Sequence, residues 1–265
     1  MKILYIDPVV SDHKIQRKLL EYLQSYKAED TELDIIGLSR GPEHLEYRYY
    51  SALVTPDVLH TLIDAETNGY DASIVGCFFD PGLQEAREVM TKMPVAAPGE
   101  SAMHIASTLG HAFSIIVGRS KWIPLLQENI HWYGFSGQLA SIKSIGMGVL
   151  EFDKNPQITS HKLMKASSEA IQTDGAEVII LGCTLQMGWH ETLQQALGVP
   201  VIDVAIAALK YAEFLAHLKT IGWTHSKIVG YESPPQNELR NWQLQEQYNF
   251  KSTIKTKLQK SDRGS

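Results

Sequence analysis

The sequence predicts an α/β protein built from two similar halves, each with a parallel sheet covered by helices. Short apolar runs rich in β-branched residues alternate along the chain with longer segments of helical periodicity. The same order of segments is repeated in the second half of the chain. We therefore expect pseudo-two-fold symmetry. Because ligands bind beyond the carboxyl ends of parallel strands, we expect the active site in the cleft between the halves.

The predicted strands are short, and each is bounded by glycine, aspartate or a turn. Most are apolar throughout rather than alternating, which indicates strands buried on both faces. In chain order they are Lys2–Ile6, Leu33–Leu38, Ala72–Gly76, Phe113–Val117, Ile142–Leu150, Val178–Leu181 and Pro200–Ile202.

The predicted helices space their apolar residues by three and four positions, so that one face is buried. Asp80 is expected to cap the helix that begins near Pro81. The predicted helices are Lys14–Tyr26, Pro56–Asn68, Leu83–Thr91, Ser101–Leu109, Ile158–Thr173, Glu191–Leu197 and Ala205–Ile221.

The repeat sets the expected domain boundaries. Lys2–Asp7 is matched by Phe113–Gly118, and Ser73–Cys77 by Val178–Cys183, each about 110 residues later. We predict a first half over 1–112, completed by chain returning from the C-terminal region, and a second half over 113–235. Residues 236–265 are polar and basic and are predicted to form a solvated extension, in which Trp242, Tyr248 and Phe250 could pack on the body or on a partner subunit.

Composition excludes several functions. The 265 residues include 24 Lys and Arg against 30 Asp and Glu, giving a net charge of -6, which argues against a nucleic-acid-binding protein. No apolar run approaches the roughly 18 residues that span a membrane, and we expect no secretory leader, because only four apolar residues precede Asp7 after Lys2. Two cysteines do not form a disulfide framework. We expect a cytoplasmic protein that acts on a small molecule.

The two cysteines are the main candidates for chemistry. Cys77 and Cys183 each follow a buried strand and a glycine, at matched places in the two halves. Backbone N–H groups at the start of a following helix would favour the thiolate there. Pseudo-symmetry would bring both thiols to one cleft, facing each other.

Facing thiols suit a racemase. One thiolate removes a proton from one face of a carbon, and the other thiol returns a proton to the opposite face. The carbanion also needs N–H donors aimed at the developing negative oxygen, and the backbone around Gly76, Gly182 and Thr184 is small enough to offer them.

These segments resemble those of hydantoin racemases, in the aspartate/glutamate/hydantoin racemase superfamily. The resemblance covers about residues 1–235, and its two cysteine motifs are specific. The matching segments are Gly76-Cys77-Phe78-Phe79-Asp80-Pro81-Gly82-Leu83, Leu181-Gly182-Cys183-Thr184, Arg40-Gly41-Pro42-Glu43, Gly99-Glu100-Ser101-Ala102, Gly198-Val199-Pro200-Val201-Ile202-Asp203 and Thr224-His225-Ser226-Lys227.

The resemblance implies a cofactor-independent racemase with no metal, acting on 5-substituted hydantoins or a close relative such as allantoin. It maps the catalytic cysteines onto Cys77 and Cys183, and it implies a homo-oligomer. Backbone N–H groups near Val9, Val10, Phe78 and Thr184 are expected to hold substrate oxygens.

Two loops depart from the family pattern. Where the family has Asn-Pro-Asn-Ser/Thr, this chain has Asp7-Pro8-Val9-Val10-Ser11, so an amide is exchanged for a carboxyl group. The loop Gly118-Arg119-Ser120 replaces small hydroxyl residues. Arg119 is expected to pair with Asp7, to hold an anionic substrate group, or to face solvent. These loops are expected to set which substituent is accepted.

Several alternatives stay open at this stage. The same fold supports other carbanion reactions, such as isomerisation or a decarboxylation that needs only one proton donor. A non-catalytic binding protein and a thiol redox protein are further possibilities. His104 is expected either near the cleft or on a helix face, and the segment around Glu43 and Glu46 either as a lid or as a helix start.

Overall fold

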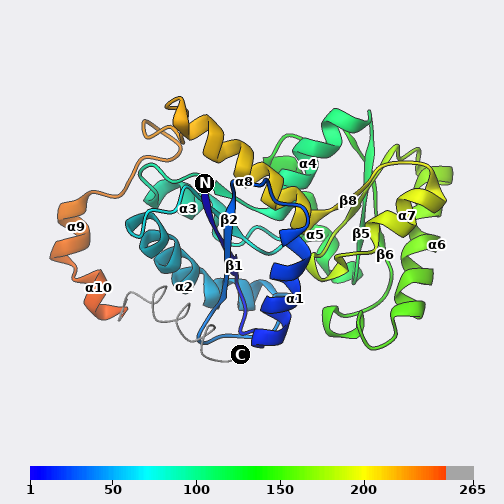
Figure 1. Cartoon of the computed structure of the whole chain (residues 1–265), viewed down its shortest axis with the longest axis horizontal. Helices are drawn as coiled ribbons and strands as arrows, with labels where there is room; N and C mark the ends of the chain where they lie inside the picture. Colours follow the sequence, from blue (N-terminus) through cyan, green and yellow to red (C-terminus); the bar gives the residue numbers. More distant parts are fainter. Residues whose placement is uncertain (249–265) are drawn as a thin grey trace.

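The computed structural model describes residues 1–248 and contains two parallel four-stranded sheets, one in each half (Figure 1). The strand order is β2-β1-β3-β4 in the first sheet and β6-β5-β7-β8 in the second, so the two halves share one topology. The predicted fold class is confirmed. The strands are β1 Lys2–Asp7, β2 Glu32–Gly37, β3 Ala72–Val75, β4 Val95–Ala96, β5 Phe113–Val117, β6 Leu139–Ser144, β7 Val178–Leu181 and β8 Val201–Asp203.

The register of the central strands repeats in both sheets. In the first, Ile6 of β1 lies opposite Val75 of β3, and the N–H of Gly76 donates to the Ile6 carbonyl at 2.8 Å. In the second, Ile116 lies opposite Leu181, and the N–H of Gly182 donates to the Ile116 carbonyl at the same distance. The glycine before each cysteine therefore leaves its sheet at an equivalent point.

Helices cover both sheets, and short 3₁₀ turns follow some of the strands. The α-helices are α1 His13–Gln24, α2 Arg48–Thr67, α3 Leu83–Val89, α4 Pro98–Leu109, α5 Ile123–Trp132, α6 Pro156–Asp174, α7 His190–Leu197, α8 Val204–Thr220, α9 Gln236–Asn241 and α10 Leu244–Gln247, and the 3₁₀ turns are η1 Ser120–Trp122, η2 Val149–Glu151 and η3 Thr184–Gln186.

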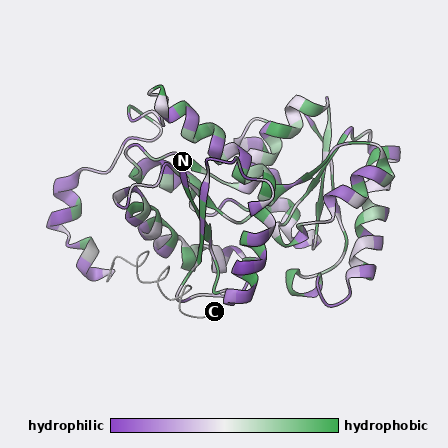
Figure 2. Ribbon diagram, viewed as in Figure 1, coloured by the Kyte–Doolittle hydropathy of each residue, from purple (hydrophilic) through white to green (hydrophobic). Residues whose placement is uncertain are grey.

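Helix α8 carries the chain from the second sheet back to the first (Figure 1). Asp203 caps it by accepting the N–H of Ala205 at 2.9 Å. Its alanines, including Ala205 and Ala208, are fully buried against Ile3 of β1, because small side chains allow the helix to approach the sheet closely. Apolar residues concentrate in the sheets and the inward helix faces (Figure 2).

Some predicted boundaries were wrong. Helix α5 was not predicted. Its Pro124 occupies the first turn, where no N–H is required, and its apolar stripe is reduced to Leu126 and Ile130. Helix α2 begins at Arg48, eight residues before Pro56, which lies inside the helix rather than at its start.

The fifth predicted strand also ended in the wrong place. Strand β6 stops at Ser144, and Gly146 turns the chain with a φ of 64°. Beyond it, Ile145 and Met147 are buried in the core of the second half, and Val149 and Leu150 line the cavity described below. The two-residue β4 was missed because it is too short to show a pattern.

No helix within residues 1–248 is both long enough and apolar enough to cross a membrane. The predicted extension begins with α9 and α10, which project away from the first sheet at the left of Figure 1. Trp242 and Tyr248 are exposed there, and the prediction for Phe250 lies outside the described residues.

Candidate active site

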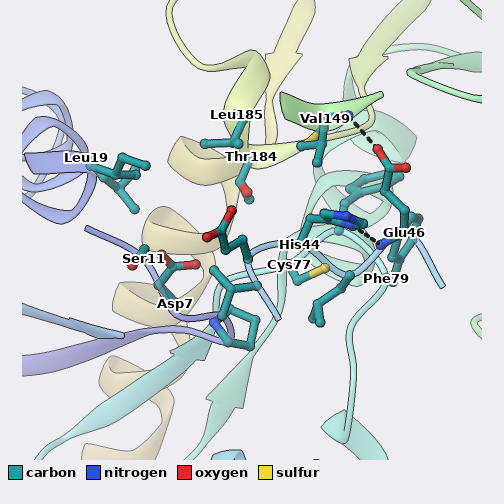
Figure 3. A pocket seen from close by; sticks show the side chains of 18 of the residues that line it. Asp7, Ser11, Leu19, His44, Glu46, Cys77, Phe79, Val149, Thr184 and Leu185 are labelled. Carbon is teal, nitrogen blue, oxygen red and sulfur yellow. Dashed lines mark hydrogen bonds between the residues drawn. The ribbon is translucent and has the colours of Figure 1, made fainter. Parts of the chain in front are cut away.

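A cavity of about 300 Å³ lies between the two halves, at the carboxyl ends of the central strands, and both cysteines line it. Figure 3 shows the side chains around Cys77. Of the sequence-predicted residues, those that line it are Asp7, Val9, Val10, Ser11, Cys77, Phe78, Cys183 and Thr184. The structure thus brings together segments about a hundred residues apart in the chain, as the repeat predicted.

The two cysteines sit in matching turns. The Cys77 N–H donates to the Val75 carbonyl at 2.8 Å, and the Cys183 N–H donates to the Leu181 carbonyl at 2.9 Å. Three residues on, the N–H groups of Asp80 and Gln186 each donate to the preceding cysteine carbonyl at 2.9 Å. Each cysteine is half-buried and forms no disulfide. The matching turns place the two side chains at equivalent backbone positions.

The glycine before each cysteine is sterically required. A Cβ on Gly76 would lie 2.6 Å from the Tyr5 hydroxyl oxygen. A Cβ on Gly182 would lie 2.9 Å from side-chain atoms of both Ile115 and Val117. Any larger residue would push the strand end, and with it the cysteine, away from the central strand of its sheet.

Burial makes both thiols weak acids. It raises the pKa of Cys183 to about 12 and that of Cys77 well above its ordinary value, where the neighbouring Cys183 adds to the shift. Backbone donors oppose this: the N–H of Phe79 lowers the pKa of Cys77, and the N–H groups of Leu185 and Gln186 lower that of Cys183. At neutral pH both thiols are therefore protonated.

Three residues that line the cavity have backbone N–H groups without a protein acceptor in the described part of the chain. Within residues 1–248, the N–H groups of Val9, Phe78 and Thr184 donate to no protein acceptor. Phe78 and Thr184 each directly follow a cysteine, so the two halves supply one such donor apiece. The expectation for Val10 was wrong, because its N–H donates to the Pro42 carbonyl at 3.0 Å.

Asp7 lies at the end of β1 with Ser11 close to its carboxyl group (Figure 3). Burial raises the pKa of Asp7 from an ordinary value of 3.8 to about 6, and the hydrogen bond with Ser11 partly opposes this shift. Arg119 does not pair with Asp7. Its Nη1 instead contacts Oε2 of Glu46 at 2.7 Å.

The Asp7 carboxyl group should make stability depend on pH. Its folded-state pKa is raised, so its contribution to stability is complete below pH 4 and is lost as pH rises through 6. Asp7→Asn removes this loss. In urea unfolding, the free energy of unfolding of the variant relative to wild type should increase by about 2 kcal/mol between pH 4 and pH 7.5. A difference that stays constant over this range would contradict the assignment.

Glu46 joins the two halves at the edge of the cavity. One carboxylate oxygen accepts the N–H of Val149 at 2.5 Å (Figure 3). The other accepts from Arg119 of the second half. The Arg119 guanidinium lies 5.8 Å from the centre of the Tyr47 ring. The segment with Glu43 and Glu46 therefore borders the cavity ahead of α2 instead of starting that helix.

Asp80 was predicted to cap the helix that follows it, and this was wrong. Helix α3 begins only at Leu83, and Asp80 has a left-handed backbone with φ of 51°. Its carboxylate instead accepts the N–H groups of Gly99 and Glu100 in the first turn of α4, both at 2.8 Å. Asp80 thus ties the turn after Cys77 to α4.

Other predicted residues lie outside the lining. Gly118 packs beneath Trp122, while Arg119 and Ser120 begin the η1 turn, and Arg119 reaches the cavity only through Glu46. His104 is also absent from the lining, since its ring stacks on Tyr211 of α8 with centroids 5.4 Å apart.

Sequence reasoning missed several lining residues. Two of them, Tyr5 and Trp122, are buried and carry donors with no protein partner among the described residues. The only signal for Tyr5 was its place near the end of the first strand, and nothing in the pattern around Trp122 marked it.

Comparison with known proteins agrees with this geometry. The family model described as Asp/Glu/Hydantoin racemase matches residues 3–212. A hydantoin racemase of Paenarthrobacter aurescens is 35% identical over 90% of this chain and 99% of its own length. The allantoin racemase structures from Klebsiella pneumoniae and Pseudomonas fluorescens superpose with TM-scores of 0.82 and 0.80, at 28% and 29% identity, over 89% of this chain and 94% and 98% of theirs.

Residues 3–212, which the family model matches, include both cysteines and all the residues that line the cavity. The chain belongs to the Asp/Glu/Hydantoin racemase family.

Proposed function

We propose that this protein racemises a 5-substituted hydantoin or a closely related cyclic ureide, with Cys77 and Cys183 as the acid and base. The observation that carries the proposal is the placement of two half-buried thiols, from equivalent turns of two similar halves, around one cavity. The similarity to hydantoin and allantoin racemases supports the ring class.

The proposed reaction removes a proton from one face of a ring carbon and adds a proton to the opposite face. One cysteine thiolate takes the proton from ring carbon C5, and the C–H electron pair moves onto the adjacent carbonyl as an enolate. The other cysteine thiol gives its proton to the opposite face of C5. The thiol and the thiolate have then exchanged places, and solvent resets them.

The free backbone donors suit the enolate. The N–H groups of Val9, Phe78 and Thr184 are fixed by their turns before substrate arrives, so they can stabilise negative charge on a ring oxygen without reorganising. They would act in a largely apolar cavity, where such donors are worth more than in water.

The charge of the lining favours an uncharged ring. Among the described residues that line the cavity, none is lysine or arginine, whereas Asp7, Asp12, Glu43 and Glu46 are acidic. Glu46 is neutralised by Arg119, but Asp7 has no cation within ion-pair distance in the described part of the chain. An anionic substrate would meet uncompensated carboxylates in a region of low dielectric.

We therefore expect selection against negative substituents. The hydantoins derived from glutamine and glutamate have side chains of nearly equal size, and only the second carries a charge at neutral pH. The amide should be racemised with about tenfold higher kcat/KM, and added salt should narrow the ratio. Chiral chromatography of initial rates at two ionic strengths would measure it. Equal rates, or a preference for the carboxylate, would contradict this electrostatic account.

The raised thiol pKa values also predict a pH profile. Because the base must be a thiolate, kcat/KM should rise with pH, by nearly tenfold per unit between pH 6 and 8. The uncatalysed racemisation must be subtracted at each pH. A profile that is flat or falling over this range would show that neither thiol is the base.

The proposed activity is tested by polarimetry of single enantiomers of several 5-substituted hydantoins and of allantoin, in the presence of a chelator. Enzyme-dependent decay of rotation to zero, with the ring intact by mass spectrometry, is the expected result. In a parallel assay with a carboxylated substrate, loss of carbon dioxide without racemisation would indicate a decarboxylase. Tight binding with no decay would indicate a non-catalytic relative.

A further inference from the structure

Tyr5 carries a buried hydroxyl group that the fold itself does not use. The residue is fully buried in β1, and its Oη has no hydrogen-bond partner among the described residues. A buried tyrosine hydroxyl normally finds a partner, because leaving it unpaired costs about 1–3 kcal/mol. The unpaired Tyr5 hydroxyl therefore lowers the stability of the folded protein.

The position of this hydroxyl explains its retention. Tyr5 lines the cavity, and its ring runs along β1 toward the cysteine end of the sheet, in the space that Gly76 leaves by lacking a side chain. A Cβ on Gly76 would lie 2.6 Å from Oη, so the hydroxyl sits beside the residue that precedes Cys77.

The surroundings fix the hydroxyl as a donor. Burial raises the pKa of Tyr5 well above its ordinary value, and the nearby acidic groups of Asp7, Cys77, Asp203 and Cys183 raise it further when they are ionised. The group therefore stays protonated throughout the proposed reaction. Both thiols are close enough to influence it, yet neither accepts its hydrogen bond.

We propose that the Tyr5 hydroxyl donates a hydrogen bond to a carbonyl oxygen of the bound cyclic ureide and so orients the ring between Cys77 and Cys183. This assignment rests on the proposed function, since the ligand is the ring that the thiols would act on. With this role, Tyr5 of β1 would be a specificity-determining residue in the lining of the cavity.

Tyr5→Phe tests the assignment with a distinctive pair of readouts. The variant removes only the unpaired oxygen, so its melting temperature should equal or exceed that of wild type. Affinity for unsubstituted hydantoin, measured by calorimetry, should fall about tenfold. This ligand is achiral, so its binding is measured whether or not the protein racemises anything.

Tyr70→Phe is the matched control. The Tyr70 hydroxyl donates to Asp34 at 2.6 Å, and neither residue lines the cavity. The melting temperature of this variant should be lower than that of wild type, and its affinity for hydantoin should be unchanged. Tyr5→Phe should instead keep its melting temperature and lose affinity for hydantoin. Opposite results in the two variants would show that the lost affinity does not come simply from removing a buried hydroxyl.

The outcomes separate the two claims. Wild-type affinity in Tyr5→Phe, a loss of stability like that of Tyr70→Phe, or no binding of hydantoin by wild type would overturn the assignment. If wild type binds hydantoin and Tyr5→Phe weakens it, but no 5-substituted hydantoin is racemised, the assignment stands and the proposed function fails.

Discussion

Replacing either cysteine by serine should abolish interconversion of the enantiomers. A serine hydroxyl is a far weaker acid than a thiol, so it supplies almost no base in a cavity that already raises the thiol pKa values. We expect kcat/KM for racemisation to fall by about 10³-fold or more in Cys77→Ser and in Cys183→Ser. Each variant should still exchange the C5 proton of one enantiomer with solvent, and the two variants should differ in which enantiomer that is.

Thermal unfolding is the control for these variants. Serine is nearly isosteric with cysteine and neither thiol forms a disulfide, so melting temperatures should remain close to that of wild type. Racemase activity retained in either folded variant would rule out the two-thiol mechanism.

Asp80→Ala should cause the largest loss of stability. Three donors lose their acceptor in this variant: the N–H groups of Gly99 and Glu100, and the Tyr133 hydroxyl at 2.8 Å. The two N–H groups belong to buried residues in the first turn of α4. Leaving these donors unsatisfied should lower the free energy of unfolding by about 3 kcal/mol or more, measured by urea unfolding at pH 7.5.

Asp34→Ala is the matched comparison. Asp34 also accepts from a tyrosine hydroxyl, that of Tyr70, but it is partly exposed and caps no helix. Its removal should cost about 1 kcal/mol. Equal losses in the two variants would contradict the proposed role of Asp80 in fixing α4 to the turn after Cys77.

The repeat made the fold and the meeting of the cysteines predictable. Two copies of an apolar strand followed by Gly-Cys define equivalent points in two sheets, and parallel sheets place such points at one edge. The structure accordingly has both thiols at one cavity. The strand pattern and the order of the segments in the chain were enough to predict that the two cysteines meet.

Contacts between distant segments were not predictable in the same way. Asp80 caps α4 instead of the adjacent helix because the left-handed turn at this residue redirects its carboxylate, and no propensity encodes that choice. Arg119 pairs with Glu46 rather than Asp7 because the loop before α2 crosses to the second half. The role suggested for Tyr5 depends on the close packing of its ring against Gly76, which only the three-dimensional structure reveals.

Isotope labelling during the first turnovers tests the two-thiol mechanism most directly. A single enantiomer of a 5-substituted hydantoin is incubated with wild type in D₂O, the enantiomers are separated at low conversion, and C5 deuterium is measured by NMR in each. We predict deuterium in the newly formed enantiomer and almost none in the remaining substrate, because one group removes the proton and another delivers solvent-derived deuterium. Equal deuterium in both would show that a single group serves both faces and would contradict the account.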